Sequence, residues 1–494
     1  MKRNVVANVL GRFYAMGSVY FFVLFYVDIL GVEKYGVIAF YTVLLTIGSI
    51  ADVGLSATLS REAARENDKA RLRDLAATME RVLLACTLLF ALVIVVFAES
   101  IAAQWLGPGA SVSQAELVTS LRLMALMIPA QMGFSLYSAG LLNIERQVAA
   151  NAILVAFVTV RGGLVIPLLY FTPSLTVFFT WQLVATVIFF MLARAIMMRA
   201  IGFNAFSLGR PSLATLQPLW GFAGGAFLFT LLSAVNSQID KLVVSKSFPI
   251  ETFGYYSLAS TLSLLPAAVV GPLIATLLPR LTRMIADGDE TGASTLLSRF
   301  ARLIAALSGL GAVGLAFFAP EIFSIWLGSE HTSPEIVTVA RILAGGGLFL
   351  ALTAVPYYLG LAHGHNRTSV VVGASTMLLT IPLLVFATER FGLVGAAWPW
   401  LLANVLAFSA LMIIVAKRYY RGSLVRLLLL SIVTPILGCA LLLSAARLVA
   451  DWFQAGPFLS CAIAGVFGLV ALALATRAEI RSVMAPFLMR WLKR

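Results

Sequence analysis

The sequence has 494 residues, of which 61% are hydrophobic and only 12% carry a charge. A water-soluble chain needs about 25% charged residues to cover its surface, so this composition excludes a soluble globular protein and predicts an integral membrane protein. The formal net charge of +13 would suggest a nucleic-acid partner in a soluble chain. Here the positions of the basic residues give a different reason for it.

Apolar stretches recur along the whole chain. A helix that spans a bilayer needs about 20 mostly apolar residues, and fourteen stretches approach or reach that length. They cover residues 8–30, 36–58, 82–98, 118–142, 150–171, 174–193, 222–248, 252–277, 303–319, 337–361, 369–388, 391–416, 427–446 and 457–476. The sequence therefore predicts an all-α integral membrane protein with about fourteen transmembrane helices and no soluble domain.

Basic residues are distributed unevenly between alternate connecting segments. One set of segments, which includes both termini, holds most of the 35 lysine and arginine residues. The other set holds Lys34, Lys241, Lys246, Arg341, Arg390 and Arg447. Because cytoplasmic segments of membrane proteins carry the excess of basic residues, the pattern places the N- and C-termini in the cytoplasm. The net charge then reflects topology, and no nucleic-acid partner is expected.

Short motifs recur in the same order in two halves of the chain. The matching segments are 33–37 with 251–255, 57–59 with 275–277, and 105–107 with 326–328. Each half contains six predicted helices, an even number, so the two repeats point the same way. Parallel repeats are typical of carriers that bind their substrate between two bundles. We therefore predict an N-terminal lobe over residues 1–210, a C-terminal lobe over 211–418, and a final helix pair with a basic cytoplasmic tail over 419–494.

Few charged residues lie inside the predicted spans, where each costs roughly 2.5–3.5 kcal/mol on insertion scales. Arg12 and Asp52 lie about 6 and 9 Å inside the cytoplasmic ends of the first two helices, at 1.5 Å per residue. They could form a structural ion pair or a cavity-facing cation with its counter-charge. Arg161 lies near the middle of the fifth helix, and Gly162 and Gly163 beside it would let a helix or a ligand approach closely. Arg161 is either a substrate-facing cation or a buried one that forms an ion pair or bonds to backbone carbonyls.

The seventh predicted helix is unusually polar in its outer half. Asn236 and Asp240 are four residues apart and share one helix face, whereas Lys241 points about 100° away from Asp240. Asp240 is a candidate proton or cation site, or alternatively an interfacial neighbour of Lys241. Asn236, Gln238 and Lys241 are candidate polar residues of a cavity.

No motif of soluble catalysis or of nucleotide binding is present, and we expect neither an enzyme nor a cofactor. The cysteines and histidines stand outside any metal-ligand spacing, so no metal site is expected. These residues are Cys86, Cys439, Cys461, His331, His363 and His365.

Several motifs, in order, resemble a known family of carriers. They are Leu-Gly-Val-Glu-Lys-Tyr-Gly at 30–36, Ala-Asp-Val-Gly-Leu at 51–55, Ser-Arg-Glu-Ala-Ala-Arg at 60–65, Gln-Ile-Asp-Lys at 238–241 and Glu-Thr-Phe-Gly-Tyr-Tyr-Ser at 251–257. With the layout of six, six and two helices, the chain resembles the polysaccharide or O-antigen (Wzx-type) flippases of the multidrug/oligosaccharidyl-lipid/polysaccharide (MOP) exporter superfamily.

The resemblance implies a multi-pass protein of the bacterial inner membrane. Such a flippase would move undecaprenyl-pyrophosphate-linked oligosaccharide repeat units from the cytoplasmic to the periplasmic leaflet, for O-antigen, exopolysaccharide or capsule synthesis. Alternating access would be driven by membrane potential or by an ion gradient. Arg12 and Arg161 are the expected cavity cations for the pyrophosphate, and Asp52 and Asp240 the expected ion-coupling residues. Membrane lipids, a polysaccharide polymerase and the chain-length machinery are the expected partners.

Three other functions fit parts of the pattern. A lipid II flippase has the same helix layout and an arginine-rich cavity. A multidrug or organic-cation antiporter of the same fold needs an anionic cavity, whereas this chain has more arginine than carboxylate in its spans. A membrane glycosyltransferase or ligase needs catalytic carboxylates and a large periplasmic loop, and the sequence shows neither.

Overall fold

The computed structural model describes residues 2–477 apart from 53–54, 66–67, 107–110, 145, 206, 208, 211–219, 269 and 366. The residues described are helical or irregular and contain no strand, which confirms the all-α prediction. The basic tail from residue 478 onward lies outside them. Contacts divide the chain into two compact units, Met1–Tyr255 and Tyr256–Arg494.

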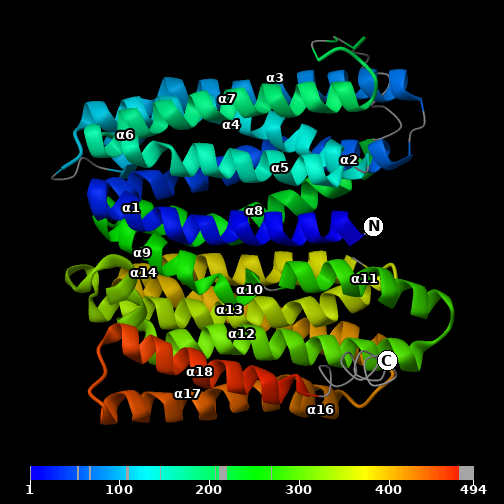
Figure 1. The fold of residues 1–494 in the computed structure, drawn as a ribbon, viewed down its shortest axis with the longest axis vertical. Coiled ribbons are helices and arrows are strands. Elements are labelled where there is room, and N and C mark those ends of the chain that lie inside the picture. The colour runs from blue at the N-terminus through cyan, green and yellow to red at the C-terminus, as the bar shows by residue number, and fades with distance from the viewer. Residues whose placement is uncertain are drawn as a thin grey trace, which may run out of the picture. The chain divides into compact units, whose positions relative to one another are not determined.

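The first unit consists of long helices that run alongside one another (Figure 1). The elements of this unit, long and short, are in chain order α1 (Lys2–Gly48), η1 (Ser49–Asp52), α2 (Leu55–Arg65), α3 (Lys69–Ile101), η2 (Ala102–Leu106), α4 (Gln114–Asn143), α5 (Gln147–Val158), η3 (Thr159–Gly163), α6 (Val165–Phe171), α7 (Leu175–Ala200) and α8 (Trp220–Ser247). Helix α9 (Ile250–Ser263) crosses the boundary to the second unit. The span predicted over 36–58 is not one α-helix, because α1 ends at Gly48 and η1 precedes α2.

Helix α4 forms the centre of the first unit. Leu117, Leu121, Met124 and Tyr137 are fully buried along its length, and α4 packs against α2, α3 and α7. Neighbouring α3, in contrast, exposes a run of large apolar side chains that includes Leu89. A helix that is apolar all round and half exposed fits a lipid surface, whereas a surface helix in water would have a polar face.

Two glycines with matching positions in the sequence repeat lie at a close backbone contact inside the first unit. A Cβ atom added to Gly36 would lie 2.3 Å from the carbonyl oxygen of Ile250, and one added to Gly254 would lie 2.5 Å from the carbonyl oxygen of Val32. Gly254 is the repeat partner of Gly36, and Ile250 occupies the repeat position of Val32. The contact is therefore reciprocal, as expected around a local two-fold axis.

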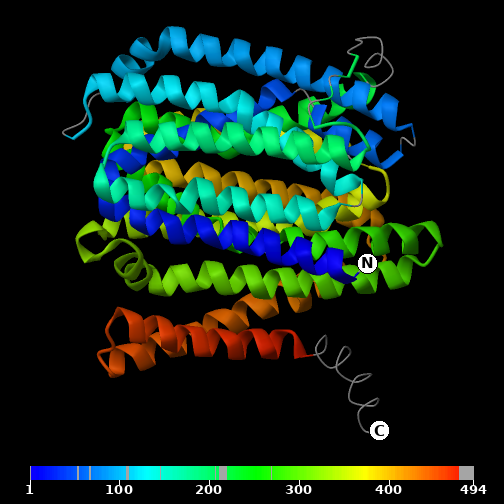
Figure 2. The same cartoon turned by 45° about the horizontal axis from the view of Figure 1, so that its top comes forward.

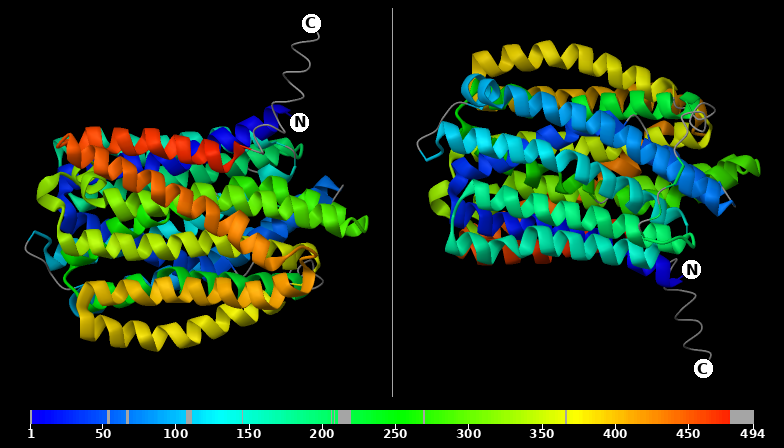
Figure 3. Two further views of the ribbon diagram at one scale, coloured as in Figure 1. Left: turned by 90° about the horizontal axis from the view of Figure 1, so that it is seen from below. Right: turned by 90° about the horizontal axis from the view of Figure 1, so that it is seen from above.

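The second unit has the same kind of organisation. Its elements are α10 (Leu265–Ala268), α11 (Val270–Ala286), α12 (Glu290–Leu327), η6 (Ser329–His331), α13 (Pro334–Ala362), α14 (Arg367–Leu411), η7 (Met412–Ala416), α15 (Lys417–Tyr419), α16 (Leu424–Arg426), η8 (Leu427–Val433), α17 (Thr434–Trp452) and α18 (Pro457–Ala475). Helix α13 is its buried centre and packs against α12 and α14. Helices α17 and α18 form a pair beside α12 (Figures 2 and 3).

Two long helices are interrupted by glycine. Inside α1 the backbone at Gly31 has φ 80° and ψ 164°, and inside α14 Gly392 has φ 64° and ψ −148°. A positive φ is readily available to glycine and costs other residues free energy, so each chain direction changes at a residue that permits it. Ten helical stretches of the described chain are long and apolar enough to cross a membrane. The chain is therefore a multi-pass membrane protein.

Candidate functional site

The first unit contains a cavity of about 280 Å³ between both parts of α1, the end of α5, η3 and α7. Most of its lining is aromatic or aliphatic, and Tyr26, Tyr41 and Phe178 are among the rings. Arg161 supplies a cation and Gln182 an amide to this lining. A pocket with mostly apolar walls and few polar groups is the usual form of a binding site for an organic ligand.

Arg161 is held by neutral partners. Its Nε donates to Gln182 Oε1, and its Nη1 donates to Gln131 Oε1 at 3.0 Å. The guanidinium carbon lies 5.5 Å from the ring centre of Tyr41 and 5.4 Å from that of Phe157, within cation–π distance. Two of the five guanidinium N–H groups thus donate to amides, and no carboxylate forms an ion pair with Arg161 within the described part of the chain.

The backbone around Arg161 is a π-helical turn. Element η3 (Thr159–Gly163) interrupts the α-helical hydrogen bonding, and such turns are frequent at functional sites. Side chains from other helices bond to its backbone: Tyr26 Oη donates to the carbonyl of Gly162 at 2.7 Å, and Trp181 Nε1 donates to that of Val160 at 3.0 Å. Gln182 Nε2 also donates to the carbonyl of Arg161 at 2.9 Å. These bonds fix the direction in which the Arg161 side chain leaves the helix.

The close approach predicted at Gly162 and Gly163 is confirmed. A Cβ atom on Gly162 would lie 2.6 Å from the ring of Phe22 in α1, so α1 passes directly over this turn. The helix that approaches is therefore the wall of the Arg161 cavity itself.

Arg12 and Asp52 are the predicted site residues of the first two spans. The backbone of Arg12 lies in α1, but its side chain is outside the described residues, so its pairing with Asp52 stays a prediction. Asp52 lies at the end of η1. Its Oδ1 accepts from the backbone N–H of Ser56 at 3.1 Å and from Ser56 Oγ at 2.8 Å. Asp52 thus caps the first turn of α2, as aspartate does at helix N-termini.

The predicted polar residues of the seventh span lie on α8. Asp240 is buried, and Asn236, Gln238 and Lys241 are partly buried. The Oε1 atom of Gln238 is buried and accepts no hydrogen bond within the described part of the chain. None of these four residues lines the Arg161 cavity. The structure thus separates the predicted cation of the fifth span from the predicted polar group of α8.

Sequence reasoning missed Gln131 and Gln182, which hold Arg161. Both are polar side chains within otherwise apolar spans, and that rarity is the signal that could have identified them. It also missed a partly buried pair between Glu80 Oε2 and Arg194 Nε at 3.2 Å; Tyr137 Oη donates to the same carboxylate oxygen at 2.6 Å. That network joins α3, α4 and α7.

No group of three or more His, Cys, Asp or Glu side chains lies close enough to hold a metal ion within the described residues. The Arg161 cavity also offers no nucleophile beside a general base among its lining residues. Arg161 is a fixed cation in aromatic surroundings, and such a group is suited to an anionic partner.

Comparison with known proteins agrees with this architecture. The chain is 25% identical over 397 residues to a Shigella flexneri protein provisionally named an O-antigen transporter, covering 76% of this chain and 88% of that protein. It has the fold of the lipid II flippase MurJ in an inward closed conformation, at a TM-score of 0.69. The two chains are 14% identical, and the match covers 97% of this chain and 100% of MurJ. It also has the fold of an inward-facing multidrug resistance MATE family transporter of the MOP superfamily. The TM-score is 0.61 and the identity 13%, and the match covers 84% of this chain and 96% of that transporter.

A sequence profile of the family described as polysaccharide biosynthesis protein matches residues 28–334, more than half of the chain. The match includes the motifs at 30–36, 51–55, 60–65, 238–241 and 251–257 on which the resemblance was based. The chain therefore belongs to the polysaccharide biosynthesis protein family.

Proposed function

We propose that this protein is a flippase for undecaprenyl-pyrophosphate-linked oligosaccharide repeat units. It moves them from the cytoplasmic to the periplasmic leaflet of the bacterial inner membrane, for assembly into O-antigen or another surface polysaccharide. The observation that carries the proposal is Arg161, a cation in an aromatic cavity whose hydrogen-bonding partners are neutral amides. A guanidinium with N–H groups left over binds phosphate oxygens in a planar, bidentate geometry.

The proposed topology has fourteen spans with both termini in the cytoplasm. Helices α1 and α14 contain 47 and 45 residues. Each would be about 70 Å long, more than twice the roughly 30 Å of the hydrocarbon layer. Breaks at Gly31 and Gly392 support two spans in each, and α8 and the run α9–α11 supply two more beyond the ten long apolar stretches. The proposed domains are an N-terminal lobe over residues 1–210, a C-terminal lobe over 211–418, and the final helix pair with its basic tail over 419–494.

Transport by alternating access needs a driving force. Moving one charge across 100 mV is worth about 2.3 kcal/mol, so a doubly anionic pyrophosphate leaving an inside-negative cell is driven outward by about 4–5 kcal/mol. An ion gradient could add to this through a titratable carboxylate. A polymerase and chain-length machinery would then consume the repeat units at the periplasmic surface.

The test is flipping by purified protein in liposomes that carry a short-chain pyrophosphate-linked oligosaccharide. With a potential imposed, we expect the glycan to reach the outer leaflet only in vesicles that contain the protein. Flipping of lipid II instead would assign the chain to that function. Proton-driven efflux of a cationic dye, without glycan movement, would contradict the proposal in favour of an antiporter.

Replacing the two candidate coupling carboxylates by amides is expected to give different results. Asp240→Asn should remove the stimulation of flipping by a pH gradient and preserve the potential-driven rate, because Asp240 is buried and its charge is replaced by a neutral group of the same shape. Asp52→Asn should keep both the stimulation by a pH gradient and the potential-driven rate, since an amide oxygen can still cap α2 at Ser56. Asp287→Asn, at an exposed position after α11, is the control. Unchanged gradient dependence in the double variant Asp52→Asn/Asp240→Asn would show that neither carboxylate couples.

A further inference from the structure

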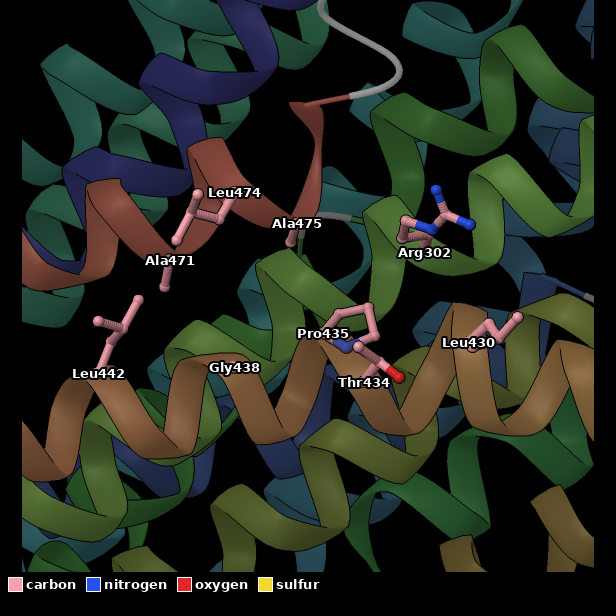
Figure 4. Close-up of a pocket in the computed structure, with 9 residues that line it drawn as sticks. All are labelled: Arg302, Leu430, Thr434, Pro435, Gly438, Leu442, Ala471, Leu474 and Ala475. Carbon is pink, nitrogen blue, oxygen red and sulfur yellow. The ribbon is translucent and has the colours of Figure 1, made fainter.

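The second unit contains a separate pocket of about 390 Å³ between α12, the start of α17 and the end of α18. Its lining consists of aliphatic, proline and glycine residues together with Thr434 and one charged side chain, Arg302 (Figure 4). Arg302 and Leu430 lie toward one end of the pocket, and Leu442 and Ala471 toward the other (Figure 4). The pocket is thus amphipathic along its length, with a cation at one end.

The pocket exists because the three helices pack closely on one side only. Gly309 of α12 lies against Ile436 of α17, where an added Cβ would approach to 3.2 Å, and Gly468 of α18 lies against Leu310, where it would approach to 2.6 Å. At Gly438 of α17, in contrast, an added Cβ would find no atom within 4 Å. Thr434, Gly438 and Leu442 are spaced by four residues, so the open space follows one face of α17.

The rim of the pocket is a surface for lipid. Leu430 is 56% exposed and Leu474 is 60% exposed, and both belong to a larger set of exposed apolar side chains on η8, α17 and α18. Arg302 immediately precedes the apolar stretch predicted over residues 303–319, and Ala475 ends α18 just before Arg477. The end of the pocket with Arg302 therefore lies near the level of the lipid headgroups, and the other end lies in the hydrocarbon layer.

We propose that this pocket binds an anionic glycerophospholipid, with its phosphate at Arg302 and one acyl chain along Gly438 toward Leu442 and Ala471. Basic pockets between transmembrane helices bind anionic headgroups, and arginine pairs with phosphate in a planar geometry. The volume corresponds to roughly a dozen groups the size of a water molecule, at about 30 Å³ each, which suits one acyl chain. This lipid is a resident of the second unit, distinct from the transported glycolipid.

The experiment is native mass spectrometry of the full-length protein titrated with phosphatidylglycerol or with zwitterionic phosphatidylethanolamine. Arg302→Gln should weaken phosphatidylglycerol binding about fivefold, the contribution typical of one basic residue near a membrane surface. It should weaken phosphatidylethanolamine binding less, because the ammonium of that headgroup partly neutralises the phosphate. Gly438→Leu, which fills the pocket, should weaken both lipids. Arg299→Gln at an exposed position of α12 and Gly465→Leu on the exposed face of α18 are the matched controls, and both should bind like the unmodified protein.

A second measurement does not depend on the folding of any variant. A phosphatidylglycerol with a diazirine in its acyl chain should label peptides that contain residues 434–442 or 471–475 of the unmodified protein. Labelling elsewhere, or phosphatidylglycerol binding that both pocket variants leave unchanged, would overturn the proposal. Displacement of the phospholipid by an equal concentration of polyprenyl phosphate would also overturn it, because the occupant would then be the carrier lipid.

Discussion

Replacing Arg161 by glutamine is expected to lower the rate of glycolipid flipping by about 10- to 100-fold, the range for loss of one hydrogen bond to a charged group. Glutamine keeps hydrogen-bonding capacity next to Gln131 and Gln182 but removes the positive charge. Arg161→Lys should be intermediate, because an ammonium keeps the charge and loses the planar fork. The measurement is the initial rate of outer-leaflet glycan in proteoliposomes at fixed membrane potential.

Two controls separate binding from folding in this prediction. Arg122→Gln removes an arginine that pairs with Glu99 at 3.1 Å on an exposed surface, and it should flip at the normal rate. Thermal unfolding in detergent shows whether Arg161→Gln is folded at the assay temperature. A folded Arg161→Gln protein with normal flipping would mean that Arg161 is structural and that the pyrophosphate binds elsewhere.

Replacing Gly36 or Gly254 by alanine is expected to destabilise the protein by about 1–3 kcal/mol each, the usual cost of forcing extra atoms into a packed region. The atoms that an added Cβ would meet are the backbone oxygens of Ile250 and Val32, at 2.3 and 2.5 Å. Backbone cannot move aside as a flexible side chain can, so the two segments must separate. The measurement is the midpoint of thermal unfolding in detergent for each variant.

The double variant Gly36→Ala/Gly254→Ala tests whether the two contacts are coupled. Once one alanine has separated the segments, the second should cost less, so the combined loss is expected to be smaller than the sum. Gly17→Ala is the matched control, since no atom lies within 4 Å of a Cβ there and alanine favours the helix. Unfolding midpoints equal to that of the unmodified protein would show that the reciprocal contact is not closely packed.

The sequence predicted the parts of this protein that depend on composition and on local pattern. Few charges and long apolar stretches require lipid contact and internally hydrogen-bonded helices, so the all-α membrane class followed from residue types alone. The motifs at 30–36 and 251–257 indicated the family that the profile match then showed. They also contain Gly36 and Gly254, and the reciprocal close contact of these two glycines explains why glycine stands at both repeat positions. The close approach at Gly162 was predictable because a small residue permits it whichever helix arrives.

The partners of the charged residues inside the spans were not predictable in the same way. The high cost of a charge inside a span points to Arg161 from sequence alone, but the residues that hold it depend on how α4, α5 and α7 are rotated against each other. Helices that are apolar all round carry little sequence signal for that rotation, since lipid and protein neighbours are equally apolar. For the same reason the Glu80–Arg194–Tyr137 network was not anticipated. Asp52 was assigned by depth in a span, whereas the structure shows it capping α2.

Composition alone makes this chain a helical membrane protein, because lipid solvation acts on every residue and shapes the composition of the whole chain. Its local motifs lie in the segment that matches the polysaccharide biosynthesis protein family. The bonds from Arg161 to Gln131 and Gln182, and the place of Arg302 at the end of a second pocket, follow from helix packing and not from any single segment. Each of these arrangements joins residues of separate helices. Their meeting depends on packing, which depends on the shapes of all the intervening side chains together and not on any one segment.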